Sequence, residues 1–143
     1  MAIRSNSRTE SSVLGSILNY LLYFGSTVAM LLIAGFIYVR FTPSNEITLI
    51  RAGNIAAAVA LGGAMIGYAC VVYSATAHGS TLLETAMWSA VSLAVQIIAI
   101  ELLRIVIRDD WKAQIEKGDL AHGVALGAFS LAIGLINAGC LTP

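Results

Sequence analysis

Apolar residues occur in four long runs along the chain, separated by short polar segments. The runs at 11–39 and 52–83 contain no Asp, Glu, Lys or Arg, and the run at 120–143 carries His122 as its only basic or acidic side chain. A helix needs about 20 apolar residues to cross the hydrocarbon region of a bilayer. The pattern therefore predicts transmembrane helices over about 16–39, 53–77, 82–107 and 120–141.

The composition of the chain agrees with a lipid environment. Hydrophobic residues make up 58% and charged residues 11% of the 143 positions, whereas soluble domains contain roughly 45–50% and about 25%. The segments between the runs are too short for a soluble domain, so we expect an all-α membrane protein. Residues 1–14 form a polar tail. The apolar run after this tail is too long for a signal peptide and is expected to remain as the first helix.

Basic residues are concentrated on one side of this predicted topology. The loops at 40–52 and 108–119 share that side, whereas both chain ends share the other side with the 78–84 loop. Loops rich in Lys and Arg stay in the cytoplasm, so we expect both termini outside it. The basic loop residues are Arg40, Arg51, Arg108, Lys112 and Lys117. They either set the topology alone or also bind anionic lipid or an acidic partner.

A ten-residue segment occurs twice in the sequence. GNIAAAVALG at 53–62 and GDLAHGVALG at 118–127 are identical at six of ten positions. In each copy Gly permits an unusual backbone conformation, and the following Asn54 or Asp119 is a good helix N-cap. The duplication predicts two parallel two-helix repeats, 15–77 and 78–143, related by an axis along the membrane normal.

Small residues recur at four-residue spacing in the second and fourth predicted spans. Helices in lipid adhere through close backbone approach, which Gly and Ala permit. We therefore expect these faces to meet near the axis or to contact another subunit of a homo-oligomer. The residues are Gly63, Gly67, Gly123, Gly127, Gly134 and Ala138.

Glu101 is an acidic residue inside the third predicted span, seven residues before Arg108. A charged side chain within a membrane requires a partner. Helical side chains lean toward the N-terminus of their helix, which favours Arg104 as the partner and places His122 nearer the loop. Together with Gln96 these residues form a candidate polar site. The site is either a packing device or a proton- or ion-linked site.

The 40–52 loop holds another polar motif, Thr42-Pro43-x-x-Glu46. Pro43 suits the first turn of a helix, Thr42 its cap, and Glu46 the positive end of its dipole. A short interfacial helix over about 43–50 is the simplest interpretation, and a partner-docking motif is the alternative. Thr81-x-x-Glu84 predicts a capping box at the start of the third span.

Aromatic residues fit the same topology. Tyr38 and Trp111 are expected at the inner membrane interface, which amphipathic rings prefer, with core packing as the alternative for each ring. Cys70 and Cys140 lie inside predicted spans, where we expect them to act as small apolar residues rather than as a disulfide or metal pair.

Several separated motifs resemble the YjfL-like inner-membrane protein family, domain of unknown function 350. They are YVRFTPSNEITLIRAGNIAAA at 38–58, Trp88, Gln96 and GLINAGC at 134–140. The resemblance implies a multi-pass protein of the bacterial inner membrane, with both termini then periplasmic. It also implies genes nearby for membrane-remodelling coat proteins, and hence a role in envelope maintenance. It assigns no catalytic residue.

Catalytic signatures do not occur in the sequence: it contains no HExxH, no G-x-S-x-G and no phosphate-binding loop. We therefore expect no enzymatic activity, cofactor, metal or nucleic acid partner. The expected function is that of an oligomeric structural or adaptor protein, with a cytoplasmic membrane-remodelling protein as its partner. The alternative is a small proton- or ion-linked channel or transporter with a site around Glu101.

Overall fold

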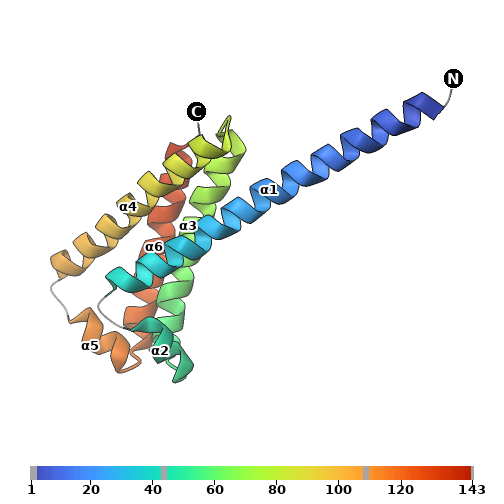
Figure 1. The fold of residues 1–143 in the computed structure, drawn as a ribbon. Coiled ribbons are helices and arrows are strands. Elements are labelled where there is room, and N and C mark those ends of the chain that lie inside the picture. The colour runs from blue at the N-terminus through green and yellow to red at the C-terminus, as the bar shows by residue number, and fades with distance from the viewer. Residues whose placement is uncertain (1–2, 43–44, 108–109, 143) are drawn as a thin grey trace.

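The computed structural model describes residues 3–42, 45–107 and 110–142, with side chains from residue 12 onward. Four long helices form within these ranges: α1 (Ile3–Phe41), α3 (Ile55–His78), α4 (Leu82–Ile107) and α6 (Leu120–Cys140). Two short helices, α2 (Glu46–Arg51) and α5 (Trp111–Glu116), lie at the opposite end of the bundle from the two chain termini (Figure 1). The long helices are apolar and long enough to cross a membrane. The all-α class and the four predicted spans are therefore confirmed.

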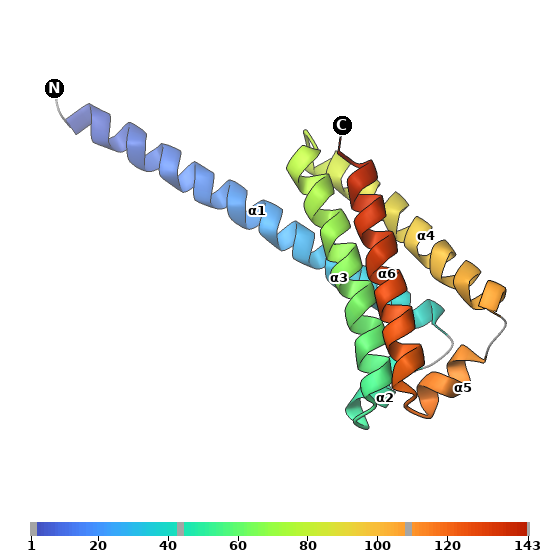
Figure 2. The same cartoon turned by 180° about the vertical axis from the view of Figure 1, so that it is seen from behind.

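The first helix differs most from its prediction. α1 begins at Ile3, so the polar segment before residue 15 continues the helix. Its 39 residues correspond to a length of about 58 Å. The helix diverges from the other three spans along its N-terminal part and approaches them toward its C-terminal end (Figures 1 and 2).

Both copies of the repeated segment start a helix in the same way. Gly53 and Gly118 have φ angles of +86° and +82°, which glycine adopts without strain. Asn54 then accepts a hydrogen bond from the first turn of α3 at 3.0 Å, and Asp119 accepts one from the first turn of α6 at 2.9 Å. The N-cap prediction is confirmed for both residues. Asn54 also donates to the Ile115 carbonyl at 2.6 Å, which ties the start of α3 to α5.

α3 and α6 run in the same direction and lie side by side (Figure 2). A Cβ atom on Gly63 would overlap the backbone of Gly127, and one on Gly134 would overlap the backbone of Gly67. The facing positions follow one spacing of four, three and four residues: Ala56, Ala60, Gly63 and Gly67 on α3, and Gly123, Gly127, Ser130 and Gly134 on α6. Close backbone approach of this kind is how helices adhere in lipid. The small-residue faces therefore meet within one chain.

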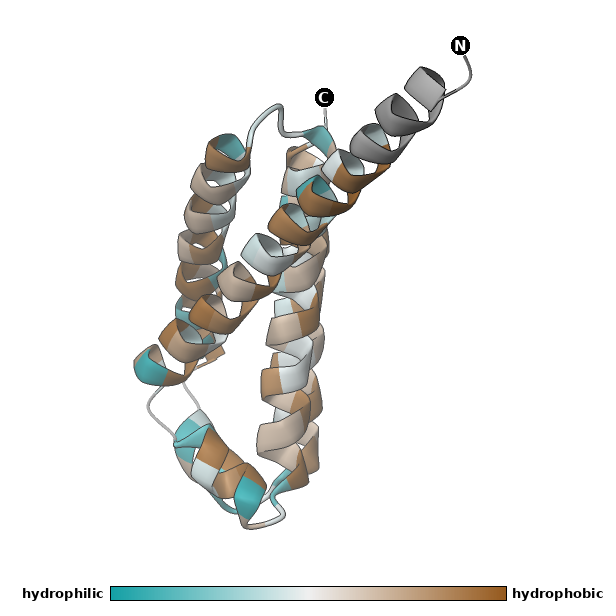
Figure 3. Cartoon of the chain, turned by 45° about the vertical axis from the view of Figure 1, so that its right-hand side comes forward, coloured by the Kyte–Doolittle hydropathy of each residue, from teal (hydrophilic) through white to brown (hydrophobic). Residues whose placement is uncertain are grey.

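α4 packs against both α3 and α6 through a row of polar side chains. Thr85, Ser89, Ser92 and Gln96 are buried along one face of the helix. Gln96 Nε2 donates to a backbone carbonyl of α3 at 3.0 Å, and Asn137 of α6 donates to the Ser92 carbonyl at 3.1 Å. Asn137 therefore helps to pack α6 against α4. The outer surfaces of α1 and α4 are mostly apolar, and hydrophilic residues gather toward the ends of the molecule (Figure 3).

The 40–52 segment differs from its prediction. α2 begins at Glu46 rather than at residue 43, and its N-cap Asn45 makes no side-chain capping bond. Thr42 does not cap α2, because its hydroxyl donates to the Tyr38 carbonyl at 2.9 Å, four residues back in α1. Pro43 lies outside the described residues.

The predicted capping box of α4 is present in part. Thr81 Oγ1 accepts a hydrogen bond from Glu84 N at 3.2 Å. The Glu84 carboxylate accepts one from Ser80 N at 2.9 Å, one residue before the expected donor. Both cysteines are free: Cys70 is half-buried, whereas Cys140 is exposed at the end of α6. Cys140 is therefore not covered by the rest of the chain.

Candidate functional site

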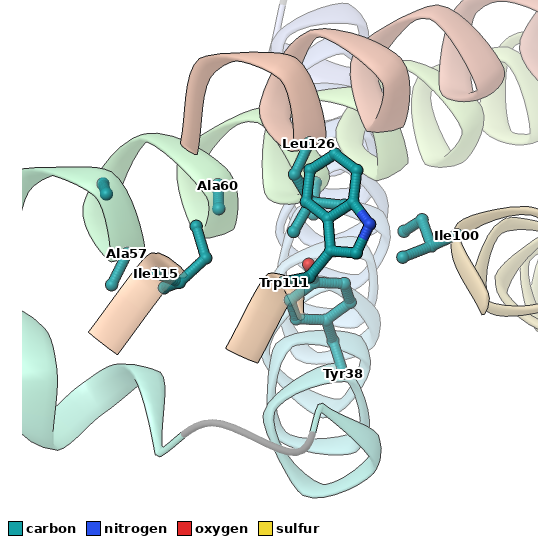
Figure 4. Packing of buried hydrophobic residues seen from close by; sticks show 9 residues of the cluster. Tyr38, Ala57, Ala60, Ile100, Trp111, Ile115 and Leu126 are labelled. Atoms are coloured by element: carbon teal, nitrogen blue, oxygen red, sulfur yellow. The ribbon is translucent and has the colours of Figure 1, made fainter. Parts of the chain in front are cut away.

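Buried side chains from several helices meet at the α2–α5 end of the bundle. Tyr38 of α1, Ile100 of α4 and Leu126 of α6 surround Trp111 of α5, with Ala residues of α3 beside them (Figure 4). Tyr38 and Trp111 are each 6% exposed. They are core residues rather than membrane-interface rings. We call the polar groups in and beside this cluster the buried polar site, which comprises Tyr38, Glu46, Glu101, Arg104 and Trp111.

Trp111 is placed by the start of α5. Asp110 caps this helix by accepting a hydrogen bond from Ala113 N at 3.1 Å. The Trp111 ring meets His122 edge-on, with 5.1 Å between the ring centroids, and His122 Nδ1 bonds Asp119 Oδ2 at 2.9 Å. Trp111 Nε1 is buried, and no group in the described ranges accepts a hydrogen bond from it.

Glu46 is the first residue of α2 and is only 1% exposed. The sequence predicts an interfacial helix start, so this burial is a correction. Among the residues that the structure describes, no donor bonds to Glu46 Oε2. Burial raises the pKa of Glu46 from 4.5 to about 7, while the positive charge of Arg104 acts in the opposite direction. Burial therefore favours the protonated form of the Glu46 carboxyl.

Arg104 and Glu101 form the ion pair expected from side-chain direction. Arg104 Nη1 donates to Glu101 Oε1 at 2.7 Å. The Arg104 side chain is 11% exposed and the Glu101 side chain 46% exposed. Arg104 Nε is buried and has no acceptor in the described part of the chain. Arg104 thus bonds directly to Glu101, and its charge also lowers the pKa of Glu46.

A small cavity adjoins the buried polar site. Its volume is about 10 Å³, and it is lined by Tyr38, Phe41, Thr42, Ile97, Ile100 and Glu101. This volume is close to the minimum that holds one water molecule. Tyr38 Oη is buried and has no hydrogen-bond partner within the described ranges. The phenol of Tyr38 and the carboxylate of Glu101 therefore belong to residues that line the same cavity.

The structure separates the four residues of the candidate polar site predicted from the sequence. Glu101 and Arg104 lie in the buried polar site. Gln96 is bonded to α3 instead, and His122 lies beside the α5–α6 loop, as expected. Sequence reasoning missed the role of Glu46, because its motif fits an exposed helix start equally well.

The basic residues predicted to face the cytoplasm lie around the α2–α5 end. Four of them are exposed, namely Arg40, Arg51, Lys112 and Lys117, and Arg108 lies outside the described residues. Acidic residues lie among them, and Lys112 Nζ is 3.9 Å from Glu116 Oε1. The surface at this end is therefore mixed in charge rather than uniformly basic.

Proton exchange is the chemistry that the buried polar site supports. With one guanidinium and two carboxyl groups, the site is electrically neutral when it holds one extra proton. Within the ranges that the structure describes, no three His, Cys, Asp or Glu side chains come together as metal ligands do.

The sequence matches the family described as Domain of Unknown Function (DUF350) over residues 12–141. It is 32% identical over 130 residues to the proteins named UPF0719 inner membrane protein YjfL from Escherichia coli K12 and Escherichia coli O157:H7. Each alignment covers 91% of this chain and 98% of the relative. No solved structure matches the chain. The chain therefore belongs to the YjfL-like family, Domain of Unknown Function (DUF350), as its motifs indicate.

Proposed function

We propose that this chain is an oligomeric scaffold of the bacterial inner membrane, with both termini in the periplasm and the α2–α5 end in the cytoplasm. Four apolar helices and the name of the Escherichia coli relatives support this location. The Lys and Arg residues at the α2–α5 end support the orientation. In this role α1 joins copies of the chain, and the α2–α5 end docks a cytoplasmic membrane-remodelling partner.

One observation carries the proposal: α1 has a face that continues beyond its contact with the bundle. Only 11% of the most apolar part of α1 is buried, against 44% for α3. The positions on this face recur every three or four residues and are Ser12, Ser16, Asn19, Tyr23, Ser26 and Met30. The last three are half-buried, whereas the first three are exposed. The half of this face that the bundle leaves uncovered is available to contact a second copy of the chain.

Asn19 favours a protein contact over a lipid contact for this face. It lies about 11 Å along the helix from the midpoint of the Ser12–Phe41 span, inside the half-thickness of about 15 Å of the hydrocarbon region. Its amide makes no hydrogen bond with the rest of the described chain. Asn side chains in membranes bond across helices. In a symmetric contact each copy presents the same Asn19 to the other.

The packed interior of one chain favours a scaffold over a channel. α3 and α6 touch backbone to backbone, and α4 is hydrogen-bonded to both of them. A polar pathway would therefore have to form between copies. The proton- or ion-linked channel or transporter is the second candidate, and the buried polar site is the observation that favours it.

We further propose that the chain consists of two repeats, 15–77 and 78–143. Supporting this, α5 begins and ends 65 residues after α2, and α6 begins 65 residues after α3. Gly53 and Gly118, with their positive φ angles, are separated by the same interval. Because α3 and α6 run in the same direction, the repeats are parallel, and the axis that relates them passes between these two helices.

Cysteine crosslinking in membranes tests the assembly through α1. In a background that carries Cys70→Ala and Cys140→Ala, Ser12→Cys and Ser16→Cys are expected to form covalent dimers on mild oxidation. Leu18→Cys is the matched control, because Leu18 is exposed on another side of the same helix. Equal crosslinking at Leu18, or none at Ser12 and Ser16, contradicts the proposal.

Asn19→Leu provides the complementary test. The substitution keeps the helix apolar and removes the amide, so we expect several-fold less crosslinking at Ser16→Cys with unchanged membrane insertion. Native mass spectrometry of the chain in lipid nanodiscs measures the same loss as a lower subunit number. If the wild-type chain is monomeric in nanodiscs, the proposal of an oligomeric scaffold is wrong.

Charge reversal tests the docking role of the α2–α5 end. Arg51→Glu together with Lys117→Glu is expected to abolish recruitment of a membrane-remodelling coat protein to vesicles that contain the chain. Vesicles of the same lipid without the chain are the control. Equal recruitment to both kinds of vesicle rules out docking.

A further inference from the structure

We propose that Glu46, Glu101 and Arg104 form a proton-binding site, in which two carboxyl groups share one guanidinium and Glu46 holds the proton. The site lies within a single chain, so its titration does not depend on the assembly of copies proposed above. Glu46 is also the first residue of α2. Loss of the proton is therefore expected to weaken the attachment of α2 to the bundle.

The charges at the site lead to this assignment. Arg104 Nη1 is already bonded to Glu101 at 2.7 Å, and the Glu101 side chain reaches the surface. Glu46 is buried, and its Oε2 has no donor within the described chain. A buried carboxylate without a full partner is unfavourable, and protonation removes that penalty. The raised pKa of Glu46 agrees with this geometry.

Within the part of the chain that the structure describes, the other charged groups around Glu46 are exposed or paired with each other, whereas Tyr38 is buried and its hydroxyl has no partner. α3 contains no Asp, Glu, Lys or Arg. The remaining groups among the described residues are Tyr38 and Arg40 on α1, Arg51 on α2, Asp110, the Lys112–Glu116 pair and Lys117 along α5, and the His122–Asp119 pair at the start of α6. Arg108 and Asp109 lie outside the described residues. Arg104 on α4 is the cation that lowers the pKa of Glu46.

Ionisation of Glu46 leaves its carboxylate two ways to gain a partner. Either it draws Arg104 away from Glu101, or it moves toward water. The movement toward water loosens α2, which otherwise packs on the core cluster through Leu49 and Ile50. We therefore expect α2 to be firmly attached below neutral pH and more mobile above it.

Trp111 fluorescence measures this titration in the full chain in lipid nanodiscs. The chain has two tryptophans, so Trp88→Phe leaves Trp111 in the core cluster as the only reporter. The Trp88→Phe protein is expected to show a transition near pH 7, and Glu46→Gln in that background is expected to abolish it. Glu101→Gln frees Arg104 for Glu46 and is expected to move the midpoint to lower pH. An unchanged midpoint in Glu101→Gln overturns the sharing of Arg104.

His122 requires its own control, because it contacts Trp111 and histidine titrates in the same range. His122→Gln is expected to retain the transition. A transition that persists in Glu46→Gln, or disappears in His122→Gln, assigns the proton to His122 and overturns the proposal.

Infrared difference spectroscopy gives a second readout that needs no tryptophan. The wild type is expected to show a protonated carboxyl band that decreases through neutral pH, and the band is expected to be absent in Glu46→Gln. Circular dichroism at one pH verifies that both proteins have the same helix content. A band that remains in a folded Glu46→Gln protein places the proton elsewhere and overturns the proposal.

Discussion

Gly63 of α3 and Gly127 of α6 touch backbone to backbone, so that a single methyl group on Gly63 would overlap the Gly127 peptide. This contact fixes the separation of the two helices at the centre of the bundle. α2 and α5 directly precede these helices, so the same contact also determines how the α2–α5 end fits together.

Gly63→Ala is expected to lower the free energy of unfolding by about 1–3 kcal/mol, because the new methyl group meets backbone atoms that cannot move aside. Gly62→Ala is the matched control. A Cβ atom at Gly62 has no neighbour within 4 Å, and alanine favours the helix by roughly 0.5–1 kcal/mol. Thermal unfolding in detergent measures both values. Equal stability of the two variants would show that the helices are not in backbone contact.

Gly118→Ala is expected to destabilise the chain by roughly 1–2 kcal/mol, because a Cβ atom disfavours the left-handed conformation. The φ angle at Gly118 is +82°. Gly118→Asn is expected to lose less, since Asn tolerates this region of φ and ψ. Gly139→Ala, at a helical position with open space around it, is the control. Equal losses for Ala and Asn at position 118 would contradict the conformational explanation.

Asn54→Asp separates two roles of one side chain. The carboxylate still caps α3, but it cannot donate to the Ile115 carbonyl, which Asn54 reaches at 2.6 Å. We expect a loss of about 1–3 kcal/mol, typical of a hydrogen-bonded group left without its partner. Increased hydrogen exchange of α5 amides in this variant locates the effect. Unchanged exchange in α5 would mean that Asn54 acts as a cap alone.

Stability is expected to decrease as pH rises through 7. The folded chain binds the Glu46 proton more tightly than the unfolded chain does, because burial raises the pKa from 4.5 to about 7. The stabilisation is fully present below pH 4.5 and is lost as the pH passes 7. The shift corresponds to about 3 kcal/mol. Urea unfolding at several pH values measures the slope, which Glu46→Gln is expected to reduce. A slope that is unchanged in Glu46→Gln points to another group.

Sequence patterns predict the long helices well because each rule concerns residues that are neighbours in the chain. The four apolar runs, the glycines before α3 and α6, and the caps Asn54 and Asp119 all act within one or two turns. The Glu101–Arg104 pair also follows from spacing along a single helix.

The buried polar site could be predicted only in part because it is assembled from separate helices. Glu46 comes from α2, Tyr38 from α1 and Trp111 from α5, and each side chain is buried only because these helices pack onto the same end of the bundle. No regular spacing along the sequence predicts that these side chains come together. The buried row on α4, from Thr85 to Gln96, does carry a signal, because its members recur at helical intervals in the sequence.

The length of α1 has a consequence for the membrane around it. Its apolar part spans 30 residues, about 45 Å, whereas the hydrocarbon region is about 30 Å thick, so the mismatch in length favours an inclined helix. A thicker bilayer reduces that inclination and a thinner one increases it. Hydrophobic mismatch thus makes the inclination of α1 depend on lipid thickness. The lateral extent of the protein in the membrane therefore changes with the lipid composition of the bilayer.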